Sequence, residues 1–193
     1  MKTVIEEIMP DRLDEYARVS IAFMVKSIYR VELIDGGLGG MTLQEVPVET
    51  PYVKDYDREE NPQDWPGKFD VRNWGFFLAR LGGRPAGAAT VAFDTTGVFM
   101  LESRRDLAVL WDIRVAPEAR GAGIPLFRSA AAWARERGCT QLKIETQNIN
   151  VPACRFYRRM GARLGEIHRY GYAGVPAVAH EVMLNWYLDL APR

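Results

Sequence analysis

The segment from Trp111 to Ala162 restricts the possible folds of this chain more than any other part. An apolar run at Ala108–Val115 leads into the glycine-containing turn Arg120–Pro125, and a helical pattern of apolar residues follows. A strand that passes directly into such a turn directs backbone N–H groups, and the positive end of the next helix dipole, at one point. The segment therefore predicts a phosphate-binding turn at the start of a helix.

The remainder of this segment continues the alternation of helix and strand. The helix that begins near Ile124 is expected to end at Gly138, because glycine suits the left-handed position after a helix. Gln141–Thr146 alternates apolar and polar residues as a strand does. Asn150 is then expected to cap a second helix, which ends at Gly161.

Flanking segments add strands on both sides. Trp74–Leu81 and Ala86–Phe93 predict a hairpin with a slightly long loop, Gly82–Pro85. Two final strands are expected, one at Arg163–Tyr172 and one at Ala179–Leu188. Since parallel neighbours need crossover helices, the order of elements predicts an α/β (α+β) fold with a mixed sheet.

The N-terminal third has weaker signals. Asp11–Tyr29 carries apolar residues close to helical period, which predicts a helix. The stretch Asp35–Gly67 contains repeated glycines and prolines and a cluster of acidic residues. It is expected to be irregular and exposed.

Composition excludes several classes of protein. A chain of 193 residues with 48% hydrophobic and 26% charged content can bury one core, which favours one domain over residues 1–193. The 25 basic and 25 acidic side chains cancel, so nucleic acid is not expected as a partner. Acidic residues near the N-terminus and the lack of a run of roughly 18 apolar residues argue against a secretion signal or a membrane partner. We expect a cytoplasmic protein.

The cysteines and histidines suggest no metal site. Cys139 and Cys154 are far apart in sequence, and His168 and His180 do not have ligand spacing. We therefore expect neither a metal nor a disulfide framework.

The glycine turn resembles the acetyl-CoA-binding turn of the GNAT family of N-acetyltransferases. The family pattern is Arg or Gln, two residues, Gly, one residue, then Gly or Ala. The matching positions are Arg120, Gly121, Ala122, Gly123 and Ile124. Pro125 stands where the family usually has Gly or Ala, and it removes one backbone N–H.

A second GNAT pattern lies downstream. The family's Asn-x-x-Ala-x-x-Phe-Tyr-x-x-x-Gly is matched by Asn150, Ala153, Phe156, Tyr157 and Gly161. Ala162 departs from the aromatic residue that commonly follows. The resemblance covers roughly residues 74–186 and implies a mostly antiparallel central sheet with helices on both faces.

Within this family the chain is most similar to the streptothricin acetyltransferases, which acetylate the β-lysine amine of an antibiotic. Three segments carry this likeness: Pro51–Tyr56, Glu145–Cys154 and Trp186–Tyr187. The second is the most specific of the three.

The resemblance assigns the cofactor-binding residues. The co-substrate would be acetyl-CoA. Backbone groups of Ile113, Arg114 and Val115 would bind its pantetheine arm, and the turn from Arg120 to Ile124, together with Asn150, would complete the site. Tyr157 matches the tyrosine that donates a proton to the departing thiolate. Without the resemblance, Tyr157 would be interpreted as a core aromatic residue.

The general base and the acceptor site remain open at this point. Asp112 and Glu145 are the candidate bases, and for each a structural ion pair, with Arg114 or Lys143, is an equal alternative. Tyr52, Asp55 and Asp57 could select a cationic amine, although an acidic run is usually a solvated loop. Trp111 is either a wall of the acceptor site or part of the core.

We expect an N-acetyltransferase that acetylates a primary amine of a small cationic molecule, with a streptothricin-like antibiotic as the leading candidate. Direct attack in a ternary complex is favoured, because neither cysteine has an obvious activating base. A protein or peptide N-acetyltransferase and a non-catalytic acyl-CoA sensor remain the alternatives. A homodimer is left open.

Overall fold

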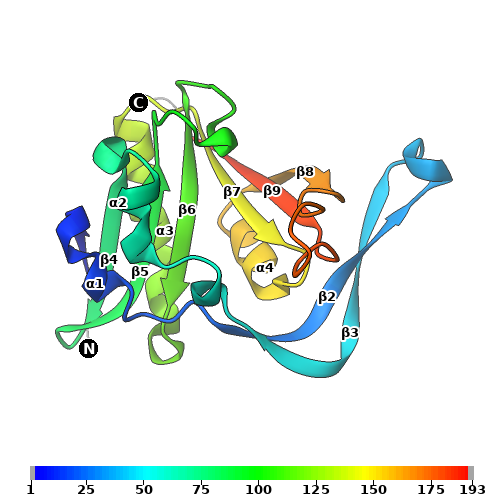
Figure 1. The fold of residues 1–193 in the computed structure, drawn as a ribbon, viewed down its shortest axis with the longest axis horizontal. Coiled ribbons are helices and arrows are strands. Elements are labelled where there is room, and N and C mark those ends of the chain that lie inside the picture. Colours follow the sequence, from blue (N-terminus) through cyan, green and yellow to red (C-terminus); the bar gives the residue numbers. More distant parts are fainter. Residues whose placement is uncertain (1–2, 191–193) are drawn as a thin grey trace. The chain divides into compact units, whose positions relative to one another are not determined.

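The computed structural model describes residues 3–190, with the exception of the side chain of Arg120. The chain forms two compact units (Figure 1). The first comprises Met1–Ala22, Asp55–Ile144 and Leu188–Arg193, and the second comprises Phe23–Lys54 and Glu145–Tyr187. Strand β7 (Gln141–Gln147) begins in the first unit and continues into the second.

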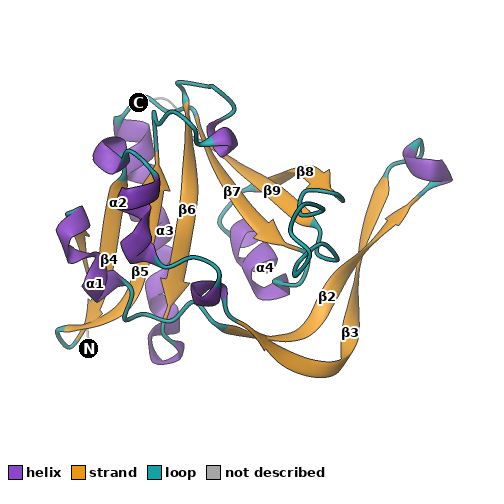
Figure 2. Cartoon of the chain, in the orientation of Figure 1, coloured by secondary structure: helices purple, strands orange, loops and turns teal. Residues whose placement is uncertain are grey.

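The first unit combines strands and helices around one sheet (Figure 2). Its strands besides β7 are β1 (Thr3–Ile8), β4 (Gly75–Leu81), β5 (Arg84–Ala92) and β6 (Leu107–Val115), and its α-helices are α1 (Leu13–Tyr16), α2 (Trp65–Lys68) and α3 (Gly123–Glu136). The strand order is β1-β4-β5-β6-β7. All neighbours are antiparallel except β6 and β7, which are parallel. As predicted, the sheet is mixed and mostly antiparallel.

Helices cover both faces of this sheet. Along β4, Phe76 and Leu78 join a buried cluster with Tyr16 and Trp65, which belong to α1 and α2. The alternate residue Gly75 instead faces Trp133 of α3. Because side chains alternate along a strand, α1 and α2 lie on one face and α3 on the other, as Figure 1 shows.

Gly75 is a point of close approach between β4 and α3. A Cβ atom at Gly75 would lie 2.6 Å from Cε2 of Trp133. We therefore expect Gly75→Ala to lower the free energy of unfolding by about 1–3 kcal/mol, the usual cost of overpacking. Urea denaturation measures this.

Gly67 provides the matched control for this prediction. A Cβ atom at Gly67 would meet nothing within 4 Å. Gly67→Ala should be neutral or slightly stabilising, because alanine restricts the unfolded chain and favours the helix. Equal midpoints for the Gly75 variant and the unaltered chain would contradict the packing described here.

The second unit contains a long hairpin and the C-terminal strands. Its elements besides β7 are β2 (Phe23–Leu33), β3 (Met41–Lys54), α4 (Val151–Arg159), β8 (Arg163–His168) and β9 (Met183–Asp189). The strands β2 and β3 form a separate two-stranded antiparallel sheet, and β9 lies between β7 and β8 in the larger sheet. Asn148, which follows β7, joins the hairpin through two hydrogen bonds with the backbone of Tyr29.

The N-terminal predictions were wrong in two places. The predicted helix Asp11–Tyr29 is only one turn long, at α1, and Phe23–Leu33 is a strand. The helical spacing was coincidental, since every second residue from Phe23 to Leu33 is also apolar or small, and pairing with β3 decides the structure. The predicted irregular stretch Asp35–Gly67 contains β3, although β3 is largely exposed as expected.

Prolines and glycines explain the second error. Pro47 and Pro51 lie within β3, which has β2 as its only neighbour in the described residues, and an edge strand tolerates proline. The glycines at 36, 37 and 40 have positive φ in the turn between the two strands.

The hairpin of β4 and β5 was predicted correctly, but its loop is the two residues Gly82–Gly83, both with positive φ, and Pro85 lies inside β5.

The elements predicted from β6 onward are present, but the last two strands are shorter than predicted, because β8 ends at His168 instead of Tyr172 and β9 begins at Met183 instead of Ala179. Gly138 has φ 80° after α3, and Gly161 has φ 95° after α4. The Oδ1 atom of Asn150 accepts a hydrogen bond from the backbone N–H of Ala153, as an N-cap should. Among residues 3–190, no helix is both long and apolar enough to cross a membrane.

Candidate active site

The glycine turn lies between β6 and α3, as predicted. β6 ends at Val115, a 3-10 turn covers Pro117–Ala122, and α3 begins at Gly123. The start of a helix carries N–H groups that have no carbonyl partner within the helix, and its dipole is positive there. The turn thus places main-chain donors where an anion could bind.

The turn contains a proline and an open glycine position. Pro125 is the third residue of α3. Its missing N–H removes one donor from the first turn of the helix without breaking a bond of the helix interior. Gly121 is exposed, and a Cβ atom there would meet nothing within 4 Å. The side chain of Arg120 lies outside the described part of the chain.

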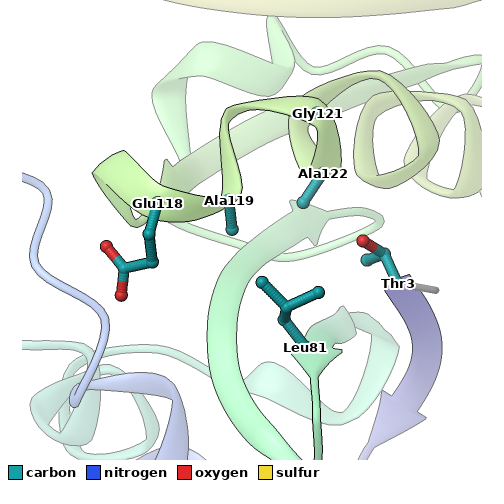
Figure 3. A pocket seen from close by; sticks show the side chains of 6 residues that line it. All are labelled: Thr3, Leu81, Glu118, Ala119, Gly121 and Ala122. Carbon is teal, nitrogen blue, oxygen red and sulfur yellow. The ribbon is translucent and has the colours of Figure 1, made fainter. Parts of the chain in front are cut away.

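A depression of about 410 Å³ adjoins the turn (Figure 3). Its lining residues are Thr3, Leu81, Glu118, Ala119, Gly121 and Ala122. Glu118 contributes a carboxylate, and none of the lining residues is basic. Because its only charged lining residue is a carboxylate, we do not assign the depression itself to the phosphates of a ligand.

Strand β6 loses its parallel neighbour half-way along its length. Its ladder with β7 joins Leu107–Leu110 to Gln141–Ile144, whereas β6 itself continues to Val115. Trp111 is an extra residue on β6, since Leu110 pairs with Val91 and Asp112 pairs with Thr90. The β6–β7 ladder therefore does not include Ile113–Val115, and the role of this backbone in binding the pantetheine arm stays a prediction.

A buried polar cluster lies beside this half of β6. Asp112 and Arg114 are two residues apart on one strand, so their side chains share a face. Nε and Nη2 of Arg114 donate to Oδ1 and Oδ2 of Asp112 at 3.0 and 2.7 Å. The hydroxyl of Tyr16 donates to Oδ1 of Asp112 at 2.7 Å. Nη1 of Arg114 donates to the carbonyl of Val19 at 3.0 Å and to Oδ1 of Asp57 at 2.8 Å.

Charge and burial fix the protonation of Arg114 and Tyr16. Burial alone would lower the pKa of Arg114, but hydrogen bonding and the charge of Asp112 outweigh burial and raise that pKa above its usual value. Burial, followed by the charge of Asp112, raises the pKa of Tyr16 well above its usual value. Arg114 therefore remains a cation and Tyr16 a neutral donor. This geometry favours the structural alternative for Asp112, whose two oxygens already accept hydrogen bonds.

Asp55 and Asp57, which were predicted for the acceptor site, take part in hydrogen bonds and ion pairs within the protein. Asp57 pairs with Arg114, and its second oxygen accepts a hydrogen bond of 3.4 Å from the backbone of Ile21. Asp55 accepts a hydrogen bond from the N–H of Asp57 and lies 3.6 Å from the guanidinium of Arg58. Both carboxylates shape the 3-10 turn after β3, so their geometry contributes to local structure.

Trp111 belongs to an aromatic cluster. Its ring centroid lies 5.2 Å from that of Phe69 and 5.3 Å from that of Trp74. Trp111 and Phe69 are partly buried and pack against the core on the α1 and α2 face. Trp111 is therefore a core residue with an accessible edge.

The second unit contains Glu145, Asn150, Tyr157 and Tyr52. Tyr157 is 6% exposed and packs edge-on against Phe156, with ring centroids 5.6 Å apart. Oε1 of Glu145 accepts a hydrogen bond of 2.6 Å from the hydroxyl of Tyr172, which accepts one from Gln147. Tyr52 is partly exposed near the end of β3.

Both cysteine thiols are buried and protonated. Burial raises the pKa of Cys139 to about 11 and that of Cys154 to about 12. Thiols with these pKa values are poor nucleophiles at neutral pH. Within residues 3–190, no group of three or more His, Cys, Asp or Glu side chains has metal-binding geometry.

The structure joins some of the predicted residues directly. Asp112, Arg114 and Asp57 form one connected cluster, and Asp55 contacts the backbone of Asp57. Tyr16 and Tyr172 were missed by the sequence analysis. Tyr16 lies 96 residues from Asp112 and Tyr172 lies 27 residues from Glu145. No local pattern in the sequence marks either partnership.

The matching family and two similar curated proteins are all acetyltransferases. The model of the acetyltransferase (GNAT) family matches residues 42–162, which is more than half of the chain. A streptothricin acetyltransferase of Escherichia coli is 28% identical over 93% of this chain and 92% of its own length. One from Streptomyces lavendulae is 33% identical over 72% of this chain and 70% of its own length.

Solved structures show the same similarity. The crystal structure of a nourseothricin acetyltransferase has a TM-score of 0.75 and 28% identity, and the match covers 99% of this chain and all of that one. A Bacillus anthracis protein, whose structure is a complex with acetyl coenzyme A, has a TM-score of 0.74 and 25% identity over 99% of both chains.

Proposed function

Since the chain belongs to the acetyltransferase (GNAT) family, we propose that it transfers the acetyl group of acetyl-CoA to a primary amine of a small cationic molecule. A streptothricin-like antibiotic is the proposed acceptor. The observation that carries the proposal is the sequence of β6, turn and α3, in which a strand without its parallel neighbour leads to the N–H groups of a helix start. Relatives named as streptothricin acetyltransferases support the choice of acceptor.

Binding of acetyl-CoA is assigned to main-chain groups. We assign the diphosphate to the N–H groups from Gly121 to Ile124, and we propose Arg120 and Asn150 as further cofactor-binding residues. The backbone from Ile113 to Val115 would hold the pantetheine arm, and an N–H there would polarise the thioester carbonyl. The acetyl-CoA complex of a relative supports this use of the fold.

The chain's side chains would then move two protons. The amine nitrogen attacks the thioester carbon and the carbon–sulfur bond breaks. Tyr157 donates its hydroxyl proton to the departing thiolate, and a carboxylate accepts the proton that the amine loses. We propose Glu145 as this base in preference to Asp112. Both oxygens of Asp112 already accept hydrogen bonds from Arg114 and Tyr16, which gives Asp112 a structural role.

Direct attack fits the cysteines better than a covalent route. A ping-pong mechanism through a cysteine would need a thiolate, and the buried thiols of Cys139 and Cys154 have raised pKa values. We further propose that both units act together as one acetyltransferase domain. For the acceptor side we propose Tyr52, Asp55, Asp57 and the accessible edge of Trp111.

One assay tests the function as a whole. Thiol release from acetyl-CoA is measured with streptothricin, aminoglycosides, polyamines and peptide N-termini as acceptors. We expect saturable release with streptothricin and slower release with the other amines. Faster release with peptide N-termini than with any small amine would reject the proposed acceptor class.

Replacement of Pro125 by alanine is expected to strengthen acetyl-CoA binding. Pro125→Ala restores one N–H in the first turn of α3, at a position where the helix tolerates either residue. If this N–H reaches the diphosphate, affinity for acetyl-CoA should rise about fivefold to tenfold, the effect of one charge-assisted hydrogen bond. The KM for acetyl-CoA measures this, and an unchanged or weaker affinity would place the diphosphate away from residue 125.

A further inference from the structure

The side chain of Arg114 contacts the two segments of the first unit that flank the β2–β3 hairpin in sequence. β2 begins at Phe23 and β3 ends at Lys54. Nη1 of Arg114 donates to the carbonyl of Val19, before β2, and to the carboxylate of Asp57, after β3. The two segments also contact each other, because the N–H of Ile21 donates to Asp57. One nitrogen of a β6 residue thus joins the point where the chain leaves the first unit to the point where it returns.

This contact requires the shape of a guanidinium. Nε and Nη2 of Arg114 form a fork on Asp112, and Nη1 uses its two N–H groups for Val19 and Asp57. A lysine ammonium would keep the charge, but it cannot present a planar fork and two further donors in these directions.

Burial makes the contact energetically important. The side chain of Arg114 is 1% exposed, that of Asp112 is 7% exposed and that of Asp57 is 27% exposed. Removal of one member of a buried ion pair leaves an uncompensated charge, which costs more than the pair itself contributes. Without Arg114, two carboxylates would face each other across the cluster, and the two flanking segments would separate.

We propose that Arg114 is a positioning residue for the acceptor amine. It fixes the segments 19–22 and 55–58 to the strand that is proposed to hold the thioester arm of acetyl-CoA. Asp55, which is proposed to contact the acceptor, accepts a hydrogen bond from the N–H of Asp57 and so belongs to the segment that Arg114 holds. The inference rests on the proposed function, and it assigns the Arg114 side chain to the acceptor instead of to acetyl-CoA.

Two variants test the inference without assuming activity. Arg114→Lys keeps the charge and removes the fork, and Asp57→Asn, at a partly exposed position, removes only one carboxylate. Arg72→Lys is the matched control, because the Arg72 side chain is 86% exposed and its pairing among the described residues is local, with Asp70. Hydrogen exchange is followed by mass spectrometry in segments 17–23, 54–60 and 123–136.

The exchange experiment has distinct outcomes. We expect about tenfold faster exchange in segments 17–23 and 54–60 of both cluster variants, with α3 unchanged and the control equal to the unaltered chain. Unchanged exchange in these two segments would overturn the inference. Equally faster exchange throughout the chain would do so as well, because it would indicate general destabilisation.

Kinetics then tests the link to the acceptor. In Arg114→Lys, whose side chain acts on the acceptor site only through Asp57 and Val19, the KM for the acceptor should rise about tenfold while the KM for acetyl-CoA stays within about twofold. Equal changes in both KM values would contradict a role in acceptor positioning. If the unaltered chain transfers acetyl groups to no amine, the proposed function fails, and the acceptor role of Arg114 fails with it. The exchange result still decides whether Arg114 holds the segments that flank the hairpin.

Discussion

The variant Tyr157→Phe is expected to lower kcat at least about a hundredfold while the KM for acetyl-CoA changes little. A positioned proton donor contributes about 10²–10⁴-fold, and phenylalanine removes the donor but keeps the ring. Because Tyr157 is 6% exposed and packs edge-on against Phe156, the ring contact should persist. Steady-state kinetics with saturating acceptor measures the loss.

Cys154 provides the control for this variant. It lies in the same helix and is buried, but burial keeps its thiol protonated. Cys154→Ala should retain at least half of the activity after correction for folded protein. The opposite pattern, with an active Tyr157 variant and an inactive Cys154 variant, would indicate a thiol nucleophile and contradict the mechanism.

The second large effect is expected at the turn itself. Gly121→Asp should weaken acetyl-CoA binding more than a hundredfold, because it places a carboxylate beside the diphosphate. Two like charges about 4–5 Å apart at an effective dielectric constant of about 20 repel by about 3–4 kcal/mol. The fold should tolerate the change, since a Cβ atom at Gly121 meets nothing within 4 Å. Equilibrium dialysis with labelled acetyl-CoA gives the affinity.

Gly67→Asp is the charge-matched control. Gly67 is exposed in α2, and a Cβ atom there also meets nothing within 4 Å. The control should bind acetyl-CoA like the unaltered chain. If both aspartate variants bind equally well, the diphosphate does not lie at the glycine turn.

The elements that the sequence predicted well are those with local causes. Asn150 caps α4 through a hydrogen bond to a residue three positions away. Gly138 and Gly161 end helices because each adopts positive φ. The strand, turn and helix start from Ala108 to Ile124 follow from apolar pattern and glycine position. Such features need no knowledge of distant residues.

The parts that sequence reasoning missed depend on distant partners. Phe23–Leu33 is compatible with a helical spacing, and only pairing with β3 makes it a strand. The cluster around Arg114 joins Val19, 95 residues away, and Asp57, 57 residues away. Buried ion pairs of this kind depend on the assembled fold, so the sequence could suggest a pairing of Asp112 with Arg114 but not the contacts of Arg114 with the segments that flank the hairpin.

The central claim is that the turn from Gly121 to Ile124 binds the diphosphate of acetyl-CoA. Calorimetric titration of the unaltered chain with acetyl-CoA tests it most directly. We predict saturable heat with one site per chain, and competition by free coenzyme A. The titration is repeated at two temperatures, at both of which the chain is folded. No heat of binding at either temperature would contradict the account.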